Sequence, residues 1–267
     1  MNRIQGEEGF CRSGSRPIVS SYGAHFGEER PLVGRGGSGT IFLTHCNLGC
    51  VFCQNSDISH LGQGDSLSTS ELAALMVKLQ RQGCHNINFV TPTHFVPQIL
   101  EALPEAVDQH LNLPLVYNCG GYESLETLRL LEGIFDIYMP DFKFNDPQAA
   151  GEYCAAPDYP EVARAALKEM HRQVGDLEVD EQGIAHRGLL VRHLVLPHGL
   201  AGTREVTSFL AKELSPDTYV NVMDQYRPCH QARRYPPLSR RISQTEFQEA
   251  IQQALQAGLH RLDGLYR

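Results

Sequence analysis

Three cysteines stand close together near the beginning of the chain, at positions Cys46, Cys50 and Cys53. Their C-x3-C-x2-C spacing allows three thiolates on one short loop to converge on a metal centre, and soft sulfur ligands select iron–sulfur clusters or zinc. A structural zinc site needs four protein ligands, and here the fourth would have to be His45, His60 or a distant cysteine. The spacing therefore favours a [4Fe-4S] cluster with one iron free of protein, with a zinc loop or three buried thiols as alternatives.

Charged residues follow or interrupt apolar runs later in the chain. Asp141 and Lys143 come directly after one such run, and a charged pair at a buried position is costly unless it has partners. Arg192 stands within the otherwise apolar run 189–196, so its guanidinium needs an anion. A carboxylate suits that role because it accepts two parallel hydrogen bonds from arginine. These positions favour a site for a charged ligand.

The elements that must position these residues begin with six short apolar runs, rich in β-branched residues, which are expected to be strands buried on both faces. Alternation of such strands with helices implies parallel βαβ units with right-handed crossovers, and an open sheet or a partial or complete barrel fits this pattern. Chemistry then belongs at the carboxyl ends of the strands. The expected strands are residues 40–44, 86–91, 115–118, 134–139, 189–196 and 219–223.

Helices are expected between these strands. Ser68 and Glu71 form a capping box, and an apolar stripe follows until Gly83 ends the helix. A second helix starts near Pro97, and Pro104 is expected to bend or break it. The stretch 180–187 is expected to be a loop. Further helices are expected at residues 124–131, 160–173, 204–214 and 244–257.

Length and composition limit the class of protein. A chain of 267 residues is long enough for one large α/β domain. A composition of 42% hydrophobic and 20% charged residues is ordinary for a globular protein. The formal net charge of −8 argues against a general nucleic-acid binder. No apolar run is long enough for a membrane span or a signal peptide, so a cytoplasmic location is expected. Eight cysteines in a reducing compartment indicate metal ligands or buried thiols.

Several blocks of the sequence resemble one known family. CNLGCVFCQN is similar to the cluster loop of the radical S-adenosylmethionine (SAM) superfamily. The blocks NINFVTPTHFVPQIL, PLVYNCGGYESLETLRLLEGIFDIYMPDFKF, VRHLVLP and NVMDQYRP resemble the branch of pyruvate formate-lyase activating enzyme-like proteins. The resemblance implies a partial (β/α)6 TIM-like barrel of the radical SAM type over residues 35–267. Residues 1–34 are then a polar amino-terminal extension, in which Cys11 stands alone where relatives of this branch carry additional cysteines.

The resemblance also implies an activity. The open iron of the cluster chelates SAM, an external one-electron donor of flavodoxin or ferredoxin type reduces the cluster, and SAM is cleaved reductively to a 5′-deoxyadenosyl radical. For this branch the substrate is a glycine Cα–H in a partner glycyl radical enzyme. Two alternatives stay open. The first is a radical SAM enzyme that acts on a small molecule or another peptide, and the second is a zinc-stabilised interaction protein without catalytic activity.

The residue roles implied by the resemblance are specific. Cys46, Cys50 and Cys53 are the catalytic cluster ligands. Thr91 and Thr93 stand where many relatives carry Gly-Gly-Glu to hold the SAM amino group, which is a departure because the carboxylate is lost. The residues expected to contact SAM are Asn55, Thr91, Thr93, Asn118, Asp141, Lys143 and Arg192.

An arginine-rich run at 227–241 is not explained by this chemistry. Tyr226 and Tyr235 are interleaved with its arginines, which is one pattern of a nucleic-acid surface. In an acidic chain the run is better interpreted as a surface loop that covers the active site or docks a partner.

Overall fold

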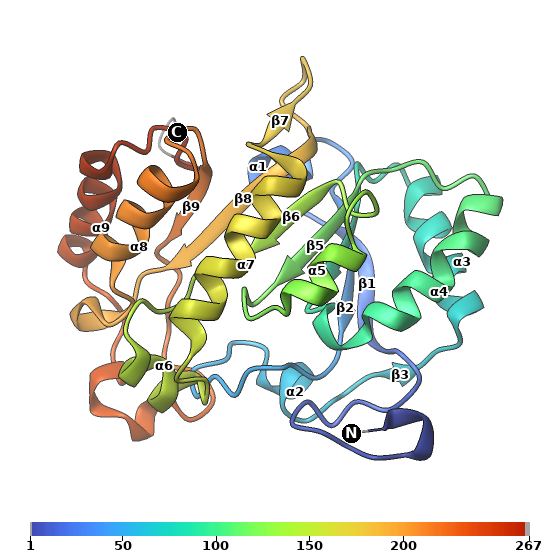
Figure 1. The fold of residues 1–267 in the computed structure, drawn as a ribbon, viewed down its shortest axis with the longest axis horizontal. Helices are drawn as coiled ribbons and strands as arrows, with labels where there is room; N and C mark the ends of the chain where they lie inside the picture. Colours follow the sequence, from blue (N-terminus) through green and yellow to red (C-terminus); the bar gives the residue numbers. More distant parts are fainter. Residues whose placement is uncertain (1, 265–267) are drawn as a thin grey trace.

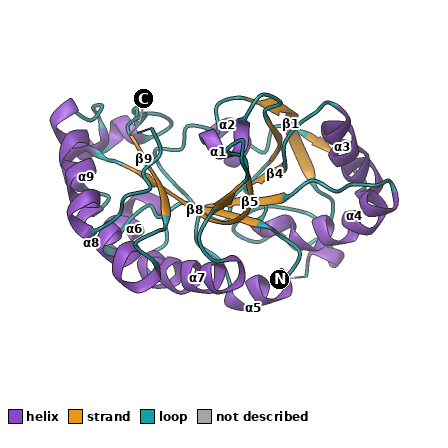
Figure 2. Cartoon of the chain, turned by 90° about the horizontal axis from the view of Figure 1, so that it is seen from above, coloured by secondary structure: helices purple, strands orange, loops and turns teal. Residues whose placement is uncertain are grey.

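Six parallel strands form the centre of the computed structural model, which describes residues 2–264. Each strand pairs in parallel with the next along the chain, so their carboxyl ends lie at one edge of the sheet. Figure 2 shows that the sheet is curved. This architecture confirms the predicted α/β class and the partial (β/α)6 barrel. The six strands are β2 (Ser38–Leu43), β4 (Ile87–Val90), β5 (Leu115–Cys119), β6 (Ile137–Pro140), β8 (Ala185–Leu194) and β9 (Tyr219–Met223).

Three further strands extend the sheet with antiparallel pairing. β1 (Ile18–His25) pairs with β2 and β3 (Asp65–Ser66) pairs with β1, although these residues were not expected to be strands. β7 (Glu178–Val179) pairs with the beginning of β8, so the expected loop 180–187 is a hairpin whose last residues already belong to the long strand β8. The predicted division at residue 34 stays a prediction, and residues 1 and 265–267 of its two ranges lie outside the described part.

Helices cover the convex face of the sheet, as Figure 2 shows from above. The capping box of Ser68 and Glu71 forms as predicted at the start of α3. Pro104 was expected to bend or break this helix; α4 continues past it to Asp108, so it is not broken there. Buried Ile99 and Ala102 anchor this helix, and packing offsets the hydrogen bond that proline cannot donate. The covering helices are α3 (Thr69–Arg81), α4 (Val96–Asp108), α5 (Leu125–Leu130), α6 (Pro147–Cys154), α7 (Tyr159–Val174), α8 (Thr203–Phe209) and α9 (Gln244–Ala257).

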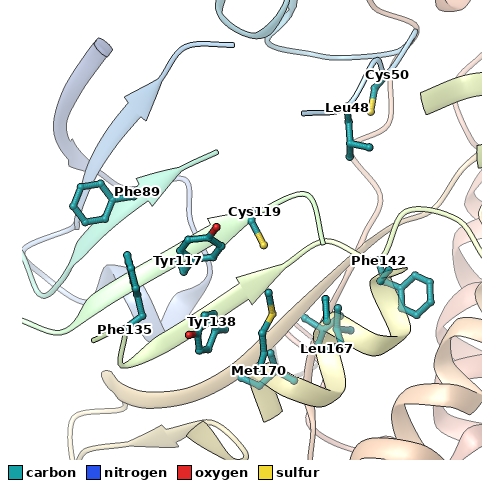
Figure 3. Close-up of a cluster of buried hydrophobic side chains, with 14 of the residues drawn as sticks. Leu48, Cys50, Phe89, Tyr117, Cys119, Phe135, Tyr138, Phe142, Leu167 and Met170 are labelled. Atoms are coloured by element: carbon teal, nitrogen blue, oxygen red, sulfur yellow. The ribbon is translucent and has the colours of Figure 1, made fainter. Parts of the chain in front are cut away.

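A row of aromatic rings connects the sheet to these helices. Phe89, Tyr117 and Tyr138 are register partners on β4, β5 and β6, and all three are fully buried. Phe135 contacts Tyr117 with its ring edge at a centroid distance of 5.0 Å. Figure 3 shows these rings together, with Met170 from α7 nearby. Aromatic burial of this kind dominates core energetics, so this face of the sheet contributes strongly to stability. A second, smaller hydrophobic cluster includes Leu32 of α1 (Arg30–Val33) with Val116 and Ile137 of the central strands.

Two short helices, α1 (Arg30–Val33) and α2 (Ser56–Ser59), lie on the concave side and at the carboxyl ends of the strands, respectively (Figures 1 and 2). None of the helices within residues 2–264 combines the length and apolar character that a membrane crossing needs.

Candidate functional site

The loop that joins β2 to α2 carries the cysteine motif and lies on the side of the molecule to which the arrowheads of β5 and β8 point (Figure 1). A cavity beside this loop is also lined by residues from the ends of β4, β5, β6 and β8. All the residues predicted for the site line it, except Thr93. Those that line it are Cys46, Cys50, Cys53, Asn55, Thr91, Asn118, Asp141, Lys143 and Arg192.

The cysteine loop is held in place through its backbone. Gly49 N–H donates to Cys154 O, and Val51 N–H donates to Tyr153 O, both at 2.9 Å, so the end of α6 fastens the loop. Val51 O accepts from Gln231 N–H at 2.8 Å on the opposite side. The peptide groups of Val51 therefore join the loop to two segments that are about one hundred and one hundred and eighty residues away in sequence.

The thiols of the loop face the cavity in an environment that keeps them protonated. Burial raises the pKa of Cys46 to about 12, and burial also raises the pKa of Cys53. Leu48 N–H donates to the Cys46 sulfur, and the Ser59 hydroxyl lies 3.1 Å from the Cys53 sulfur. Hydrogen bonds to ligating sulfur are a feature of iron–sulfur sites. Iron binding has to displace the thiol protons, because the thiolate is the metal ligand.

Within residues 2–264, no three His, Cys, Asp or Glu side chains are grouped so as to hold one metal ion. A [4Fe-4S] cluster has a different requirement, since each thiolate binds its own iron and the ligands surround a volume. Cys46, Cys50 and Cys53 all line the cavity, and cysteine thiolates are the ligands that such a cluster uses.

A fourth cysteine, which the sequence did not single out, belongs to this neighbourhood. Cys154 ends α6, is fully buried, and has its sulfur 3.1 Å from the sulfur of Cys50. This contact, followed by burial, raises the pKa of Cys50 well above its usual range. No spacing rule reveals Cys154, because it lies 104 residues after Cys50.

The polar wall of the cavity is organised around Asp141. Its carboxylate accepts from Lys143 Nζ at 2.5 Å and from Arg192 Nε at 2.8 Å, and Arg192 also donates to Asn118 Oδ1 at 2.7 Å. Burial alone would raise the pKa of Asp141, but the two cations hold it below the usual value. Asp141 in turn raises the pKa of Lys143 against the effect of burial. The anion that Arg192 was predicted to need is thus supplied, in this structure, by the chain itself.

A further carboxylate approaches Arg192 from the interior of the barrel. Glu28 Oε2 lies 3.8 Å from Arg192 Nη1, and the Glu28 side chain is almost fully buried. Burial raises the pKa of Glu28, and Arg192 opposes the rise. Sequence reasoning missed Glu28, because it precedes α1 and only the closure of the barrel brings it to β8.

Tyr159 connects the loops that carry these residues. Its hydroxyl accepts from Lys143 N–H and lies 2.9 Å from both Gly120 O and Asp141 O. The ring is fully buried. This one hydroxyl therefore fixes the turn after β5 against the turn after β6.

Thr91 and Thr93 take different positions. Thr91 lines the cavity, with its N–H donating to Asn118 O at 2.8 Å. The Thr93 hydroxyl instead donates to Glu123 Oε1 at 2.7 Å, so the structure does not bring it to the cavity wall. Burial raises the pKa of Glu123 to about 7, against hydrogen bonds from Thr93 and Tyr117 that lower it. Sequence reasoning missed this buried carboxyl as well.

Two cavity-side residues have left-handed backbones. His45, directly before the cysteine motif, has a φ of 65°, and Thr91 has a φ of 60°. Neither is glycine, and for a β-branched residue such as Thr91 this conformation is a genuine outlier. Conformations of this kind cost on the order of 1–3 kcal/mol and persist only where the surrounding structure determines them.

Comparison with known proteins gives two kinds of relationship. The family model of the radical SAM superfamily matches residues 40–177. The uncharacterized protein MJ0674 of Methanocaldococcus jannaschii is 34% identical over 258 residues, which are 93% of this chain and 70% of that protein.

Solved structures of HydG, a maturase of the [FeFe]-hydrogenase, have a similar fold. One has a TM-score of 0.56 at 12% identity over 82% of this chain, and HydG from Carboxydothermus hydrogenoformans has a TM-score of 0.55 at 15% identity over 84%. The alignments cover 49% and 51% of those proteins, so this chain spans about half of their length. At such identities the likeness concerns the fold alone.

The Tyr159 hydroxyl is predicted to matter for stability. Tyr159→Phe leaves the Lys143 N–H without its acceptor in a buried position, so the free energy of unfolding should fall by about 1–3 kcal/mol. Urea denaturation measures this loss. The control is Tyr122→Phe, which removes a hydroxyl bonded to Asp158 at the surface and should change stability by less than about 0.5 kcal/mol. Equal effects of the two variants would contradict the assignment.

His193 predicts a dependence of stability on pH. Its Nδ1–H donates to Phe142 O and its Nε2 accepts from the Thr203 hydroxyl, and burial lowers its pKa to about 4. The unfolded chain binds this proton near the ordinary value of 6.5. Stability is therefore complete above pH 6.5 and falls towards pH 4, by at most about 1.4 kcal/mol per pH unit. In cluster-free protein, His193→Gln should remove this part of the dependence of the unfolding free energy on pH. An unchanged pH dependence would refute its assignment to His193.

Proposed function

This chain belongs to the radical SAM superfamily, and we propose that it cleaves SAM reductively and directs the resulting radical at a substrate hydrogen atom. Members of the superfamily bind a [4Fe-4S] cluster and SAM. The observation that carries the proposal is the cavity itself, which joins three thiols to a hydrogen-bonded set of charged and polar side chains. A cytoplasmic location is part of the proposal, because eight cysteines suit metal ligands or buried thiols in a reducing compartment.

Cys46, Cys50 and Cys53 are the proposed cluster ligands. The bound cluster supplies the electron that breaks the C5′–S bond of SAM. The chain contributes the fixed loop, the hydrogen bonds to sulfur and the apolar side chains of Leu48 and Phe52 beside the thiols. These side chains would limit the access of water to the metal centre, and solvent access is one of the factors that set the redox potential of such a centre.

Four side chains are proposed to hold the polar end of SAM. Lys143 and Arg192 are cations at the cavity, and the SAM carboxylate would exchange for part of their contact with Asp141. Asp141 and Asn118 then offer oxygen acceptors for the SAM amino group. Among these four side chains, Lys143 and Arg192 carry two positive charges against the single negative charge of Asp141, so the set favours one additional anionic group, which the SAM carboxylate would supply. Asn55 and Thr91 line the same space and complete the proposed set.

The finer proposal is that the substrate is a glycine Cα–H in a partner glycyl radical enzyme. It is supported by the sequence blocks that resemble pyruvate formate-lyase activating enzyme-like proteins, which include the strand ends carrying Asn118, Asp141 and Arg192. With a partner deuterated at glycine, deuterium should appear in 5′-deoxyadenosine. Its absence would leave SAM cleavage standing and refute the glycyl substrate.

The ligand assignment predicts which cysteines the cluster needs. Cys46→Ser, Cys50→Ser and Cys53→Ser should each lose iron and sulfide, because a three-ligand site cannot spare one thiolate. Cys154→Ser is the matched control, since its sulfur touches that of Cys50 but it is not a proposed ligand. Iron and sulfide analysis after anaerobic reconstitution measures the result. If Cys154→Ser loses the cluster while Cys50→Ser keeps it, the ligands are assigned wrongly.

The proposed activity predicts that reduced, cluster-loaded protein converts SAM to 5′-deoxyadenosine and methionine, detected by chromatography.

The proposed contact with SAM predicts that Arg192→Ala binds SAM about ten- to hundredfold more weakly, measured by calorimetry, because a charge-assisted hydrogen bond contributes about 1.5–3 kcal/mol. Iron and sulfide content should not change. Arg187→Ala, at the start of the same strand and outside the cavity lining, is the control. Intact SAM after long incubation would refute the activity, and wild-type affinity in Arg192→Ala would refute the contact.

A further inference from the structure

Residues 225–243, between β9 and α9, form a segment of unusual charge, named here the arginine segment. It contains five arginines and neither Asp nor Glu. The whole chain has a formal net charge of −8, so removing these five positive charges leaves −13 on the rest. A concentrated cationic segment on an acidic protein is an electrostatic feature that the proposed SAM chemistry does not use.

The arginine segment lies directly against the cysteine loop. Gln231 N–H donates to Val51 O at 2.8 Å, and the His230 ring stacks on His60 at a centroid distance of 4.6 Å. His60 Nε2 in turn lies 3.2 Å from Cys50 O. A short chain of contacts thus leads from the surface of the segment to the backbone of a proposed cluster ligand. In Figure 1 the segment is the orange-red chain below α6, next to the blue loop that follows β2.

The arginines of this segment face solvent rather than the cavity. Arg240 pairs with Glu246 at 2.7 Å. The other four are exposed, none lines the cavity, and within residues 2–264 none of the four forms a salt bridge. These four are Arg227, Arg233, Arg234 and Arg241.

We propose that the arginine segment is the docking surface for an acidic one-electron donor protein of the flavodoxin or ferredoxin type. The inference rests on the proposed function, which requires an external electron for every SAM molecule cleaved reductively. In this step the donor loses one electron, the cluster gains it, and no bond of either protein is made or broken. Electron transfer weakens steeply with distance, so the donor has to dock close to the cysteine loop.

The position of the segment meets this requirement. The exposed arginines are not part of the cavity lining, so a donor bound to them does not take the place of SAM. Clustered positive charge steers an acidic partner and raises its association rate, most strongly at low ionic strength.

A nucleic acid fits the segment less well. Tyr226 is almost fully buried, with its ring against Phe52, and Tyr235 packs edge-on against Tyr153. The ring of Tyr226 is therefore not presented for stacking on bases, and that of Tyr235 is half-buried, whereas single-stranded nucleic-acid sites generally present a series of such rings. The acidic remainder of the chain would also repel a long polyanion.

The test compares two double charge reversals with the same change in net charge. Arg233→Glu/Arg234→Glu alters the segment, and Arg35→Glu/Arg81→Glu alters exposed arginines on other elements. Binding of a purified flavodoxin to cluster-loaded protein is measured by calorimetry, and cluster reduction by the reduced flavodoxin is followed by absorbance. The segment variant should bind about tenfold or more weakly at low salt and be reduced correspondingly more slowly, with the difference shrinking at high salt. Reduction by dithionite and SAM affinity should equal wild type.

The possible results distinguish a failure of the proposed docking surface from a failure of the proposed SAM cleavage. Equal loss in both double variants would show an effect of net charge alone, and no loss in the segment variant would place the donor elsewhere; either overturns the docking surface. Salt-dependent binding of a single-stranded RNA oligonucleotide that requires Arg233 and Arg234, with unchanged flavodoxin binding, would also overturn it. Failure of the proposed function has a different signature, in which flavodoxin or dithionite reduces the cluster but SAM stays intact.

Discussion

The polar architecture of this molecule depends on one buried carboxylate, that of Asp141. Two cations, Lys143 and Arg192, are drawn out of water into the same cavity, and each would be strongly destabilising there without a counter-charge. Asp141 contacts both and is itself kept ionised by them, and Glu28 adds a second carboxylate 3.8 Å from Arg192. The arrangement exists because β6 and β8 are parallel neighbours, so that Asp141 at the end of one strand reaches Arg192 on the other. Removing Asp141 would thus disturb charge balance as well as ligand contacts.

The second determining feature is the support of the cysteine loop. The loop has little regular structure of its own, and its shape is imposed by the end of α6 on one side and by the arginine segment on the other. Val51 takes part in both contacts through its two peptide groups. A metal-binding loop supported in this way keeps its ligands near their final positions before the metal arrives, which reduces the ordering that metal binding has to impose.

The sequence predicts the central strands and helices well because they carry strong local signals. Strand 219–223 and helix 244–257 have the predicted bounds, since each has an unbroken pattern and the helix begins with its own capping box. β1 was missed because its residues are mostly half-buried or exposed, so no continuous apolar run marks it. Glu28 and Cys154 were missed for another reason. Their place beside Arg192 and Cys50 is created by the closure of the barrel and by α6, and no local pattern encodes such contacts.

The left-handed backbones of His45 and Thr91 have a consequence for how this protein can change over time. Glycine would adopt both conformations without steric cost, so a lineage under pressure for stability alone has an easy route to a more relaxed chain at these two positions. That route loosens the residue directly before the cysteine motif and a residue on the cavity wall. Persistence of histidine and threonine there in a set of homologues would therefore record selection on the rigidity of the site, whereas drift to glycine would mark copies of the gene in which that selection has been relaxed.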